Sequence, residues 1–309
     1  MHFVGVALVA LLLVSGSAPA PSLGSGIPDG SGAAVVTATR HGERLMTVDV
    51  DSPSVGRTTV SLLLPARYEA QPERTWPVLY LLHGATNDHA TWLEETDVEG
   101  LTEDLDILVV MPDGGDYGFY SDGWDAGAGG RPLWETYHLE ELPRLLEERF
   151  RASDVRAVAG PSMGGFGAIA YAARRPGMFR AAASFSGVLD IFSLGRLGED
   201  IWGDRDDHLE EWLAHDPVTL APALDGTALY VSWGSGEPGP LDDDEAPFDV
   251  VEAWLAAGNE RFVDRLAELG LSATIDGYGP GTHTWPYWER ALADALPMLM
   301  ASLGDPATT

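Results

Sequence analysis

Short apolar runs alternate with longer amphipathic stretches from about Leu45 to the end of the chain. The apolar runs are bounded by glycine, proline and aspartate, a pattern typical of buried strands. They are GRTTVSLLLP (56–65), PVLYLLHG (77–84), DILVVMPDGG (106–115), VRAVAG (155–160), AAASFSG (181–187), ALYVSWGSG (228–236) and SATIDGYG (272–279).

The stretches between these runs have helical spacing. Residues 134–150 place Leu139, Leu142, Leu146 and Phe150 on one side of a helix. Further helices are predicted over residues 167–176 and 251–269 and from Trp285 onward. Strands that alternate with helices predict an α/β fold with a mostly parallel central sheet covered by helices on both faces. Residues 188–224, which carry Trp202 and Trp212, interrupt the alternation and are expected to form a small cap beside the site.

The N-terminal residues differ in composition from the rest of the chain. The run FVGVALVALLLVSGSAPA (3–20) ends in small residues that resemble a signal-peptidase site, so residues 1–20 are predicted to be a secretory signal peptide. Its apolar part is shorter than the roughly 20 residues of a membrane span, so we expect a secreted protein without a stable span after cleavage. A buried first helix or a misplaced start codon is the alternative. Residues 21–44 are predicted to be a flexible Gly/Pro/Ser-rich leader, and residues 45–305 the folded domain.

Composition narrows the possible partners and chemistries. The 309 residues include 18 Lys and Arg against 48 Asp and Glu, a net charge of −30, which disfavours nucleic acid and anionic membranes. The chain has no cysteine, which excludes disulfides, thiolate metal sites and a cysteine nucleophile. The sequence does not indicate an oligomeric state.

The stretch GPSMG (160–164) follows the predicted strand 155–160 and precedes a helix. This strand–turn–helix setting of a G-x-S-x-G pattern is that of a nucleophile elbow, in which a strained serine is exposed between two glycines. Ser162 is therefore the candidate nucleophile, and a structural serine in a tight turn is the alternative.

A nucleophilic serine needs a base and an acid, which follow it in the order Ser, Asp/Glu, His in α/β-hydrolases. His283 follows the last predicted strand and is the candidate base, while His138 and His215 are interpreted as structural. Glu237, directly after a strand, is favoured as the acid by position, but spacing alone leaves several carboxylates open. They are Glu237, Asp242, Asp243, Asp244, Glu245, Asp249 and Glu252.

An oxyanion hole needs two N–H donors. The expected donors are the residue after the nucleophile, Met163, and Ala85 in the loop after the strand 77–84. No histidine–carboxylate cluster has metal-ligand spacing and no glycine loop is of the phosphate-binding type, so we expect neither a metal nor a cofactor.

Several motifs in the same order give the chain a resemblance to an esterase family of α/β-hydrolases that includes esterase D and the antigen 85-type mycolyltransferases. The likeness runs from about Leu45 to Leu303 and is strongest to the secreted mycolyltransferase branch. It is carried by VLYLLHG, VMPDGGDYGFYSD, WETYHLEELP, GPSMGGFGA, WLAHDPVTL and GTHTWPYW.

The resemblance implies an α/β-hydrolase fold and selects one acid. In these relatives the catalytic carboxylate begins the helix between the last two strands, and the matching residue here is Glu252. Mycolyltransferases carry Asp and Arg near the trehalose-binding end of the pocket, where this chain has His83 and Thr86. Trehalose mycolylation is therefore not expected, and His83-Gly84 matches the plain esterases of the family.

The combined interpretation is a serine esterase that hydrolyses a small-molecule, lipid or carbohydrate ester through an acyl enzyme. An acyltransferase that passes the acyl group to a sugar or lipid alcohol is the nearer alternative, and a non-catalytic binding protein on a hydrolase scaffold the farther one. The residues expected to contact the substrate are His83, Phe119, Tyr120, Trp124 and Trp285.

Overall fold

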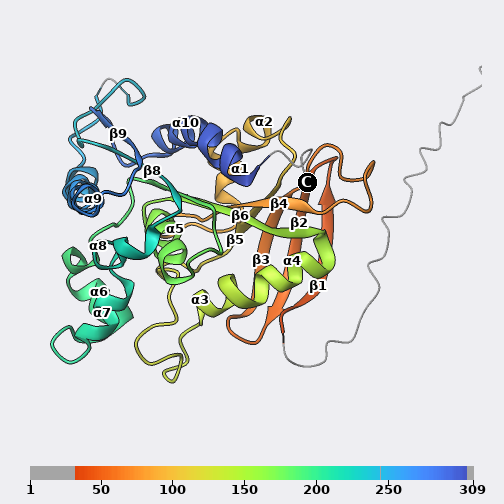
Figure 1. Cartoon of the computed structure of the whole chain (residues 1–309), viewed down its shortest axis with the longest axis horizontal. Coiled ribbons are helices and arrows are strands. Elements are labelled where there is room, and N and C mark those ends of the chain that lie inside the picture. Colours follow the sequence, from red (N-terminus) through yellow and green to blue (C-terminus); the bar gives the residue numbers. More distant parts are fainter. Residues whose placement is uncertain (1–31, 244, 305–309) are drawn as a thin grey trace, which may run out of the picture.

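A sheet of nine strands runs through the computed structural model, which describes residues 32–243 and 245–304 (Figure 1). The strand order is β1-β2-β3-β5-β4-β6-β7-β8-β9. The strands are β1 (Ala34–His41), β2 (Leu45–Ser52), β3 (Gly56–Leu63), β4 (Trp76–Leu81), β5 (Leu108–Pro112), β6 (Ala152–Pro161), β7 (Ala181–Phe185), β8 (Ala228–Gly234) and β9 (Thr274–Gly279).

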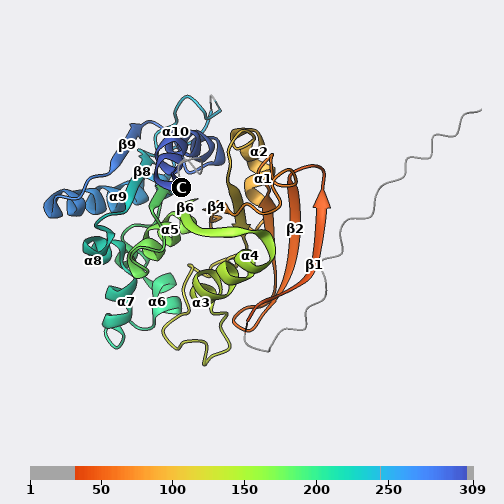
Figure 2. The ribbon, with the colours of Figure 1, turned by 45° about the vertical axis from the view of Figure 1, so that its right-hand side comes forward.

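The sheet is antiparallel at its N-terminal edge and parallel elsewhere. Strands β1, β2, β3 and β5 pair antiparallel in that order, and all pairs from β5 to β9 are parallel. Figures 1 and 2 place β1–β3 on the right and the helices α6–α9 on the left. The predicted mostly parallel α/β-hydrolase architecture is confirmed.

Helices or helical turns follow most of the strands. They are α1 (Thr91–Glu95), α2 (Val98–Leu101), α3 (Trp134–Thr136), a π turn η1 (Tyr137–Glu141), α4 (Leu142–Phe150), α5 (Met163–Arg174), the 3₁₀ turn η2 (Ile191–Leu194), α6 (Arg196–Trp202), α7 (Leu209–His215), α8 (Pro217–Leu220), the 3₁₀ turn η3 (Ala221–Leu224), α9 (Val250–Leu269) and α10 (Trp285–Leu303).

Helices cover both faces of the sheet, with a separate apolar core on each. Along β4, Val78 and Tyr80 join the core formed with α4, α5 and α9, while Leu79 and Leu81 join the core formed with α1, α2 and α10. This alternation follows from the two-residue period of a strand. Because both faces are buried, the central strands read as continuous apolar runs in the sequence.

The predicted helix 134–150 is present but contains the π turn η1. At its end the N–H of Leu142 bonds the carbonyl of Tyr137, five residues earlier. The next residue is Pro143, which has no N–H to continue the regular hydrogen-bond pattern. The turn keeps His138 and Leu139 buried inside the fold.

The prediction of a flexible leader is wrong for residues 34–44. Residues 34–41 form β1, which pairs with β2 along its length, and Gly42 turns the chain with a φ of 86°. The strand has β-branched residues, which favour strands, but it lies at the sheet edge and most of its side chains are exposed. It therefore lacks the continuous apolar run that marks the buried strands.

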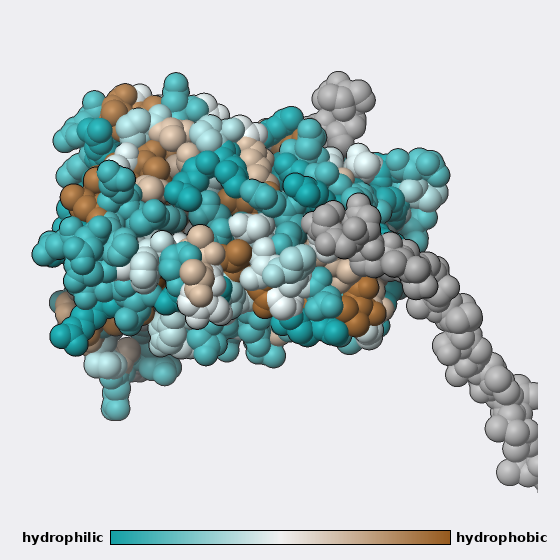
Figure 3. Space-filling model, turned by 90° about the horizontal axis from the view of Figure 1, so that it is seen from below, coloured by the Kyte–Doolittle hydropathy of each residue, from teal (hydrophilic) through white to brown (hydrophobic). Residues whose placement is uncertain are grey.

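The predicted signal peptide and the start of the predicted leader lie outside the described residues. Among the residues that the structure describes, no helix is long and apolar enough to cross a membrane. The face shown in Figure 3 is mostly hydrophilic, with apolar patches scattered between polar side chains.

Residues 188–224, the predicted cap, form the short helices from η2 to η3 between β7 and β8. Trp202 and Trp212 are buried and pack edge to face, with ring centroids 5.7 Å apart. Trp202 also packs against Phe166 of α5, at 5.6 Å. The cap is therefore anchored on the helix that follows Ser162.

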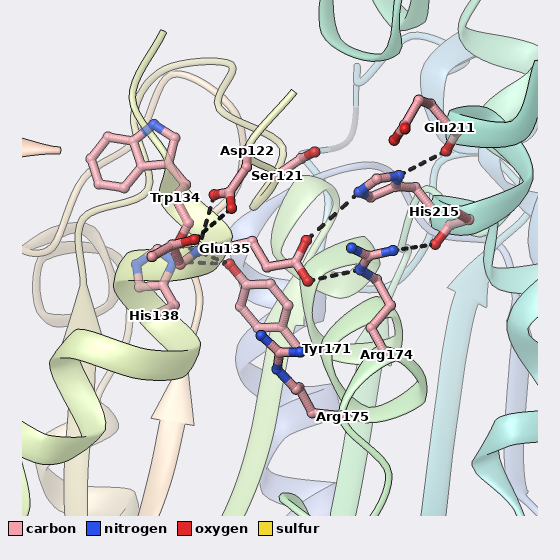
Figure 4. A network of polar contacts seen from close by, with 12 residues as sticks. Ser121, Asp122, Trp134, Glu135, His138, Tyr171, Arg174, Arg175, Glu211 and His215 are labelled. Atoms are coloured by element: carbon pink, nitrogen blue, oxygen red, sulfur yellow. Dashed lines mark hydrogen bonds and ion pairs between the residues drawn. The ribbon is translucent and has the colours of Figure 1, made fainter. Parts of the chain in front are cut away.

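A buried ion-pair network joins this cap to the rest of the domain (Figure 4). Glu135 lies between Arg174, whose Nε donates to it at 2.8 Å, and His215 of α7, whose Nε2 lies 3.6 Å away. Burial alone would raise the pKa of Glu135, but His215 and Arg174 outweigh it and lower the pKa below its usual value. Glu135 is therefore ionised, and its charge depends on these two partners.

We expect Arg174→Met to lower the free energy of unfolding by about 2–3 kcal/mol, because it leaves the buried Glu135 carboxylate without its closest cation. Arg175→Met is the matched control, since Arg175 pairs with Glu140 at the surface and such pairs contribute at most about 1 kcal/mol. Urea unfolding followed by circular dichroism measures both. Equal losses in the two variants would contradict a special role for the buried pair.

Candidate active site

Ser162 occupies a strained turn between β6 and α5. Its φ is 54° and its ψ is −119°, a conformation that glycine adopts readily and serine rarely. Hydrogen bonds fix the turn, because the N–H of Ser162 bonds Phe185 at 2.9 Å and its carbonyl accepts from Val188 at 3.2 Å. The side chain is thereby presented above the carboxyl ends of the parallel strands.

The glycines on both sides of Ser162 are required by the close approach of two backbones. A Cβ on Gly164 would lie 2.6 Å from the carbonyl oxygen of Leu82, and one on Gly160 would lie 2.8 Å from the same atom. Neither distance is possible for real atoms, and the obstacle is backbone that cannot move aside. The two glycines therefore allow the turn to sit against the end of β4.

Ser162, His283 and Glu252 form a continuous hydrogen-bonded chain. The hydroxyl of Ser162 lies 2.9 Å from Nε2 of His283, and Nδ1 of His283 lies 2.7 Å from Oε2 of Glu252. With Nδ1–H donating to the carboxylate, Nε2 is free to accept the serine proton. Residues from three distant parts of the sequence are thus brought together as expected.

The Glu252 side chain is completely buried, yet its carboxylate is well supplied with donors. Its Oε1 accepts from the hydroxyl of Ser186 at 2.7 Å and from the N–H of Gly234 at 2.6 Å. Tyr278 lies 3.5 Å from the same oxygen. Burial and the charge of Glu252 raise the pKa of Tyr278, so the phenol keeps its proton. These donors stabilise a charge that would otherwise be costly to bury.

The alternative acid, Glu237, is exposed. Its carbonyl accepts from the N–H of Gly281, at the start of the loop that carries His283. The acid at the start of α9, selected by the family resemblance, is the one that contacts the histidine.

The two expected oxyanion donors are unoccupied. Within residues 32–243 and 245–304, the N–H groups of Ala85 and Met163 have no protein acceptor. Met163 is the first residue of α5, where the N–H groups point out of the helix end. Thr86, beside Ala85, has a positive φ of 62° and donates to Asp116 at 2.8 Å, which fixes the loop.

The structure does not support a substrate contact for His83 or Tyr120. Both are almost completely buried. The nitrogens of His83 are used internally, with Nδ1 at 2.7 Å from the carbonyl of Gly84 and Nε2 accepting from Gly114 at 2.8 Å. The Tyr120 hydroxyl donates to the carbonyl of His83 at 2.8 Å. Both residues therefore hold the Ala85 loop in place by hydrogen bonds from inside the fold.

The other predicted substrate contacts have different surroundings. Phe119 is buried against Phe166 and Trp202, so it belongs to the core. Trp124 is 45% exposed and lies against His208 of the cap segment, with ring centroids 4.5 Å apart.

Trp285 is half-buried and lies near His283. It packs edge-on against Trp288, at 5.0 Å, and Trp288 packs against the His283 ring, at 4.8 Å. It thus lies one ring away from His283, and its contact with substrate remains a prediction.

The remaining histidines of interest are structural, as expected. His138 is buried between the Tyr171 hydroxyl and the carbonyl of Asp113, and burial lowers its pKa to about 4. Across the described ranges, no group of three or more His, Cys, Asp or Glu side chains could hold a metal ion.

Sequence reasoning missed Ser186 and Asp249. Ser186 donates to Glu252 from a left-handed conformation with a φ of 47°, which is rare for serine. Asp249 was one of the carboxylates left open as the acid, but its Oδ2 accepts the N–H of His283 at 2.9 Å, so it holds the backbone of the base. The short motif FSG gives no signal for the first, and an N-cap position before α9 would have indicated the second.

A family model and several curated proteins are similar to this chain in sequence. A family model described as "Putative esterase" matches residues 33–299. The diacylglycerol acyltransferase/mycolyltransferase Ag85B of Mycolicibacterium smegmatis is 32% identical over 97% of this chain and 95% of its own. Esterase Rv1288 of Mycobacterium tuberculosis is 40% identical over 80% of this chain and 57% of its own.

Solved structures share the fold at lower identity. An S-formylglutathione hydrolase from Agrobacterium tumefaciens superimposes with a TM-score of 0.69 at 21% identity, covering 87% of this chain and 99% of that one. MPT51 (FbpC1) of Mycobacterium tuberculosis gives a TM-score of 0.68 at 24% identity, covering 82% and 96%.

The strain at Ser162 predicts an unusual order of stability. We expect Ser162→Gly to be about 1–2 kcal/mol more stable than Ser162→Ala, because glycine adopts this φ and ψ without cost. Ser153, on the preceding strand β6 and without a positive φ, is the control, where glycine is expected to be the less stable by about 0.5–1 kcal/mol. Chemical denaturation of the four variants measures this, and the same order at both positions would contradict strain at Ser162.

Proposed function

Because the chain belongs to the putative-esterase family of α/β-hydrolases, we propose that Ser162, His283 and Glu252 are the catalytic triad of a serine esterase. The protein is an enzyme of the hydrolase or acyltransferase type that acts on esters. The observation that carries the residue assignment is the unbroken hydrogen-bonded chain from the Ser162 hydroxyl through the His283 ring to the buried Glu252 carboxylate.

In the first half of the reaction, Ser162 attacks the ester carbonyl while His283 takes its proton at Nε2. Glu252 holds the Nδ1–H tautomer of His283 and stabilises the imidazolium that forms. His283 then donates the proton to the leaving alcohol, which leaves the acyl group on Ser162.

The N–H groups of Ala85 and Met163 are the oxyanion hole of this proposal. Both lie beside the Ser162 turn and have no acceptor among the described residues. They stabilise the negative charge on the carbonyl oxygen as it becomes tetrahedral, and such a donor is typically worth about 100- to 1,000-fold in rate. In the second half of the reaction, water activated by His283 releases the acid.

Acyl transfer is the second candidate, because an alcohol can take the place of water at the same acyl enzyme. The 32% identity with a protein named diacylglycerol acyltransferase/mycolyltransferase over nearly the full chain supports it. Hydrolysis is favoured here by the position of His83, which is buried with both ring nitrogens occupied and offers no group to a sugar.

Secretion is part of the proposal and rests on the apolar N-terminal run and on the small residues after it. Mass spectrometry of the protein recovered from an exporting bacterial host is the test. A mature chain that lacks about the first 20 residues is expected, and full-length protein retained in the cytoplasm would contradict export.

Hydrolysis of p-nitrophenyl esters of increasing acyl length tests the triad. We expect Ser162→Ala and Glu252→Gln each to lower kcat by about 10⁴-fold, the second because the histidine loses its tautomer. Glu237→Gln is the matched control and is expected to keep wild-type activity, since its side chain is exposed. Full activity of Glu252→Gln combined with loss in Glu237→Gln would reverse the assignment of the acid.

The same assay distinguishes the two reactions when glycerol or trehalose is added as acceptor. For an esterase we expect free acid as the main product at all acceptor concentrations, with the rate of p-nitrophenol release unchanged. Product that shifts to the acylated acceptor in proportion to its concentration would make the protein an acyltransferase.

A further inference from the structure

Asp249 lies between the segments that carry the acid and the base. It is the N-cap residue of α9, three positions before Glu252, in a loop that follows β8. Its own N–H bonds the carbonyl of Gly236, and its carbonyl accepts from Ala253 in the first turn of the helix. Both backbone polar groups of Asp249 are therefore hydrogen-bonded, which fixes its position at the start of α9.

The two oxygens of the Asp249 carboxylate have different partners. Oδ1 accepts from the N–H groups of Val251 and Glu252, at 2.8 and 3.1 Å, as an N-cap side chain does. Oδ2 accepts from the backbone N–H of His283, at 2.9 Å. One carboxylate thus joins the backbones of the proposed acid and the proposed base, which are 31 residues apart in sequence.

The carboxylate is ionised in this position. Partial burial would raise the pKa of Asp249, but the N–H donors of His283, Glu252 and Val251 outweigh burial and lower it below the usual value. Hydrogen bonds to a charged acceptor are shorter and stronger than those between neutral groups. The hydrogen bonds from the two segments to the Asp249 carboxylate are therefore strong.

We propose that Asp249 is a positioning residue that sets the distance between Glu252 and His283 by holding both backbones with one carboxylate. The inference rests on the proposed triad, but the geometry that it concerns can be measured without turnover. Catalytic groups must be held within about 0.5 Å, and a displacement of about 1 Å can cost roughly 100-fold in rate. Without the link, the backbone of the His283 loop loses its hydrogen bond to the N-cap of α9.

A neighbouring contact does not replace this link. Asp242 receives hydrogen bonds from Thr282 and Tyr287 and so ties the 235–249 loop to the His283 loop and to α10. It has no contact with Glu252 or α9 among the described residues, so it anchors the base without the acid. Asp249 holds the backbone N–H groups of both segments with one carboxylate.

Two substitutions separate the link from the cap. Asp249→Asn keeps an N-cap oxygen for α9, because Asn and Asp cap equally well, but turns an NH₂ group toward the N–H of His283. Asp249→Ser also caps, but has one oxygen only and cannot hold both segments. Asp97→Asn, at the N-cap of α2, is the matched control for losing an aspartate at a helix start.

The full chain is measured in two ways. Proton NMR follows the low-field resonance of the proton between His283 and Glu252, assigned by its absence in His283→Ala. Hydrolysis of p-nitrophenyl acetate gives kcat and KM, with Ser162→Ala as background. We expect the resonance to be lost or broadened by solvent exchange in both Asp249 variants, and kcat to fall about 30- to 100-fold with KM within twofold. Asp97→Asn is expected to match the wild type.

An unchanged resonance and unchanged kcat in both Asp249 variants would overturn the inference. So would a loss of activity that merely follows the loss of folded protein by circular dichroism, because that indicates a cap and nothing more. If the wild type shows no Ser162-dependent hydrolysis but the resonance disappears in both Asp249 variants, the positioning role stands and the proposed esterase function fails.

Discussion

The site depends on one close approach, in which the β6–α5 turn lies directly against the end of β4. Any side chain at Gly160 or Gly164 would collide with the backbone at Leu82 and His83. This contact holds Ser162 in a conformation that serine rarely adopts. It also brings the start of α5, with the Met163 N–H, next to the loop that carries the Ala85 N–H. The proposed nucleophile and the proposed oxyanion donors are therefore positioned by the same backbone contact.

The strain at this contact has to be offset by neighbouring structure, and the buried polar residues do this. His83 and Tyr120 hold the Ala85 loop through its carbonyls and through Gly114. Ser186 and Gly234 hold the Glu252 carboxylate on the other side. Each is a buried polar group with a defined partner, so its hydrogen bonds fix one geometry. The site is rigid because its supports are inside the fold and shielded from water.

The fold and the strained turn at Ser162 could be predicted from the sequence because both leave local signals. Buried strands give continuous apolar runs, and the Gly160–Gly164 pattern marks a tight turn between strand and helix. Strand β1 could not be predicted in this way because it is a mostly exposed edge strand. Its stability comes from pairing with β2, which a local pattern does not record.

The positions of the aromatic residues after Asp113 could not be predicted from the sequence, for a different reason. Phe119 and Tyr120 were expected at the substrate, but both have positive φ values and are turned into the core. Apolar composition alone cannot distinguish a pocket wall from a core residue. Composition also could not identify the acid, since many carboxylates follow β8 and only the family resemblance selected Glu252.

In the proposed triad, Ser162 is placed by different physical means from His283 and Glu252. This explains why the position of Ser162 could be predicted from a local sequence pattern and the pairing of His283 with Glu252 could not. Ser162 is placed by backbone sterics within a single strand–turn–helix unit, so its signature is contiguous. His283 and Glu252 are on separate segments that are linked by hydrogen bonds, through Glu252 itself and through Asp249. Hydrogen-bonded carboxylates leave no spacing rule, because acidic residues are also the main surface charge of a chain with a net charge of −30. Their partners, and hence their roles, are defined only once the chain has folded.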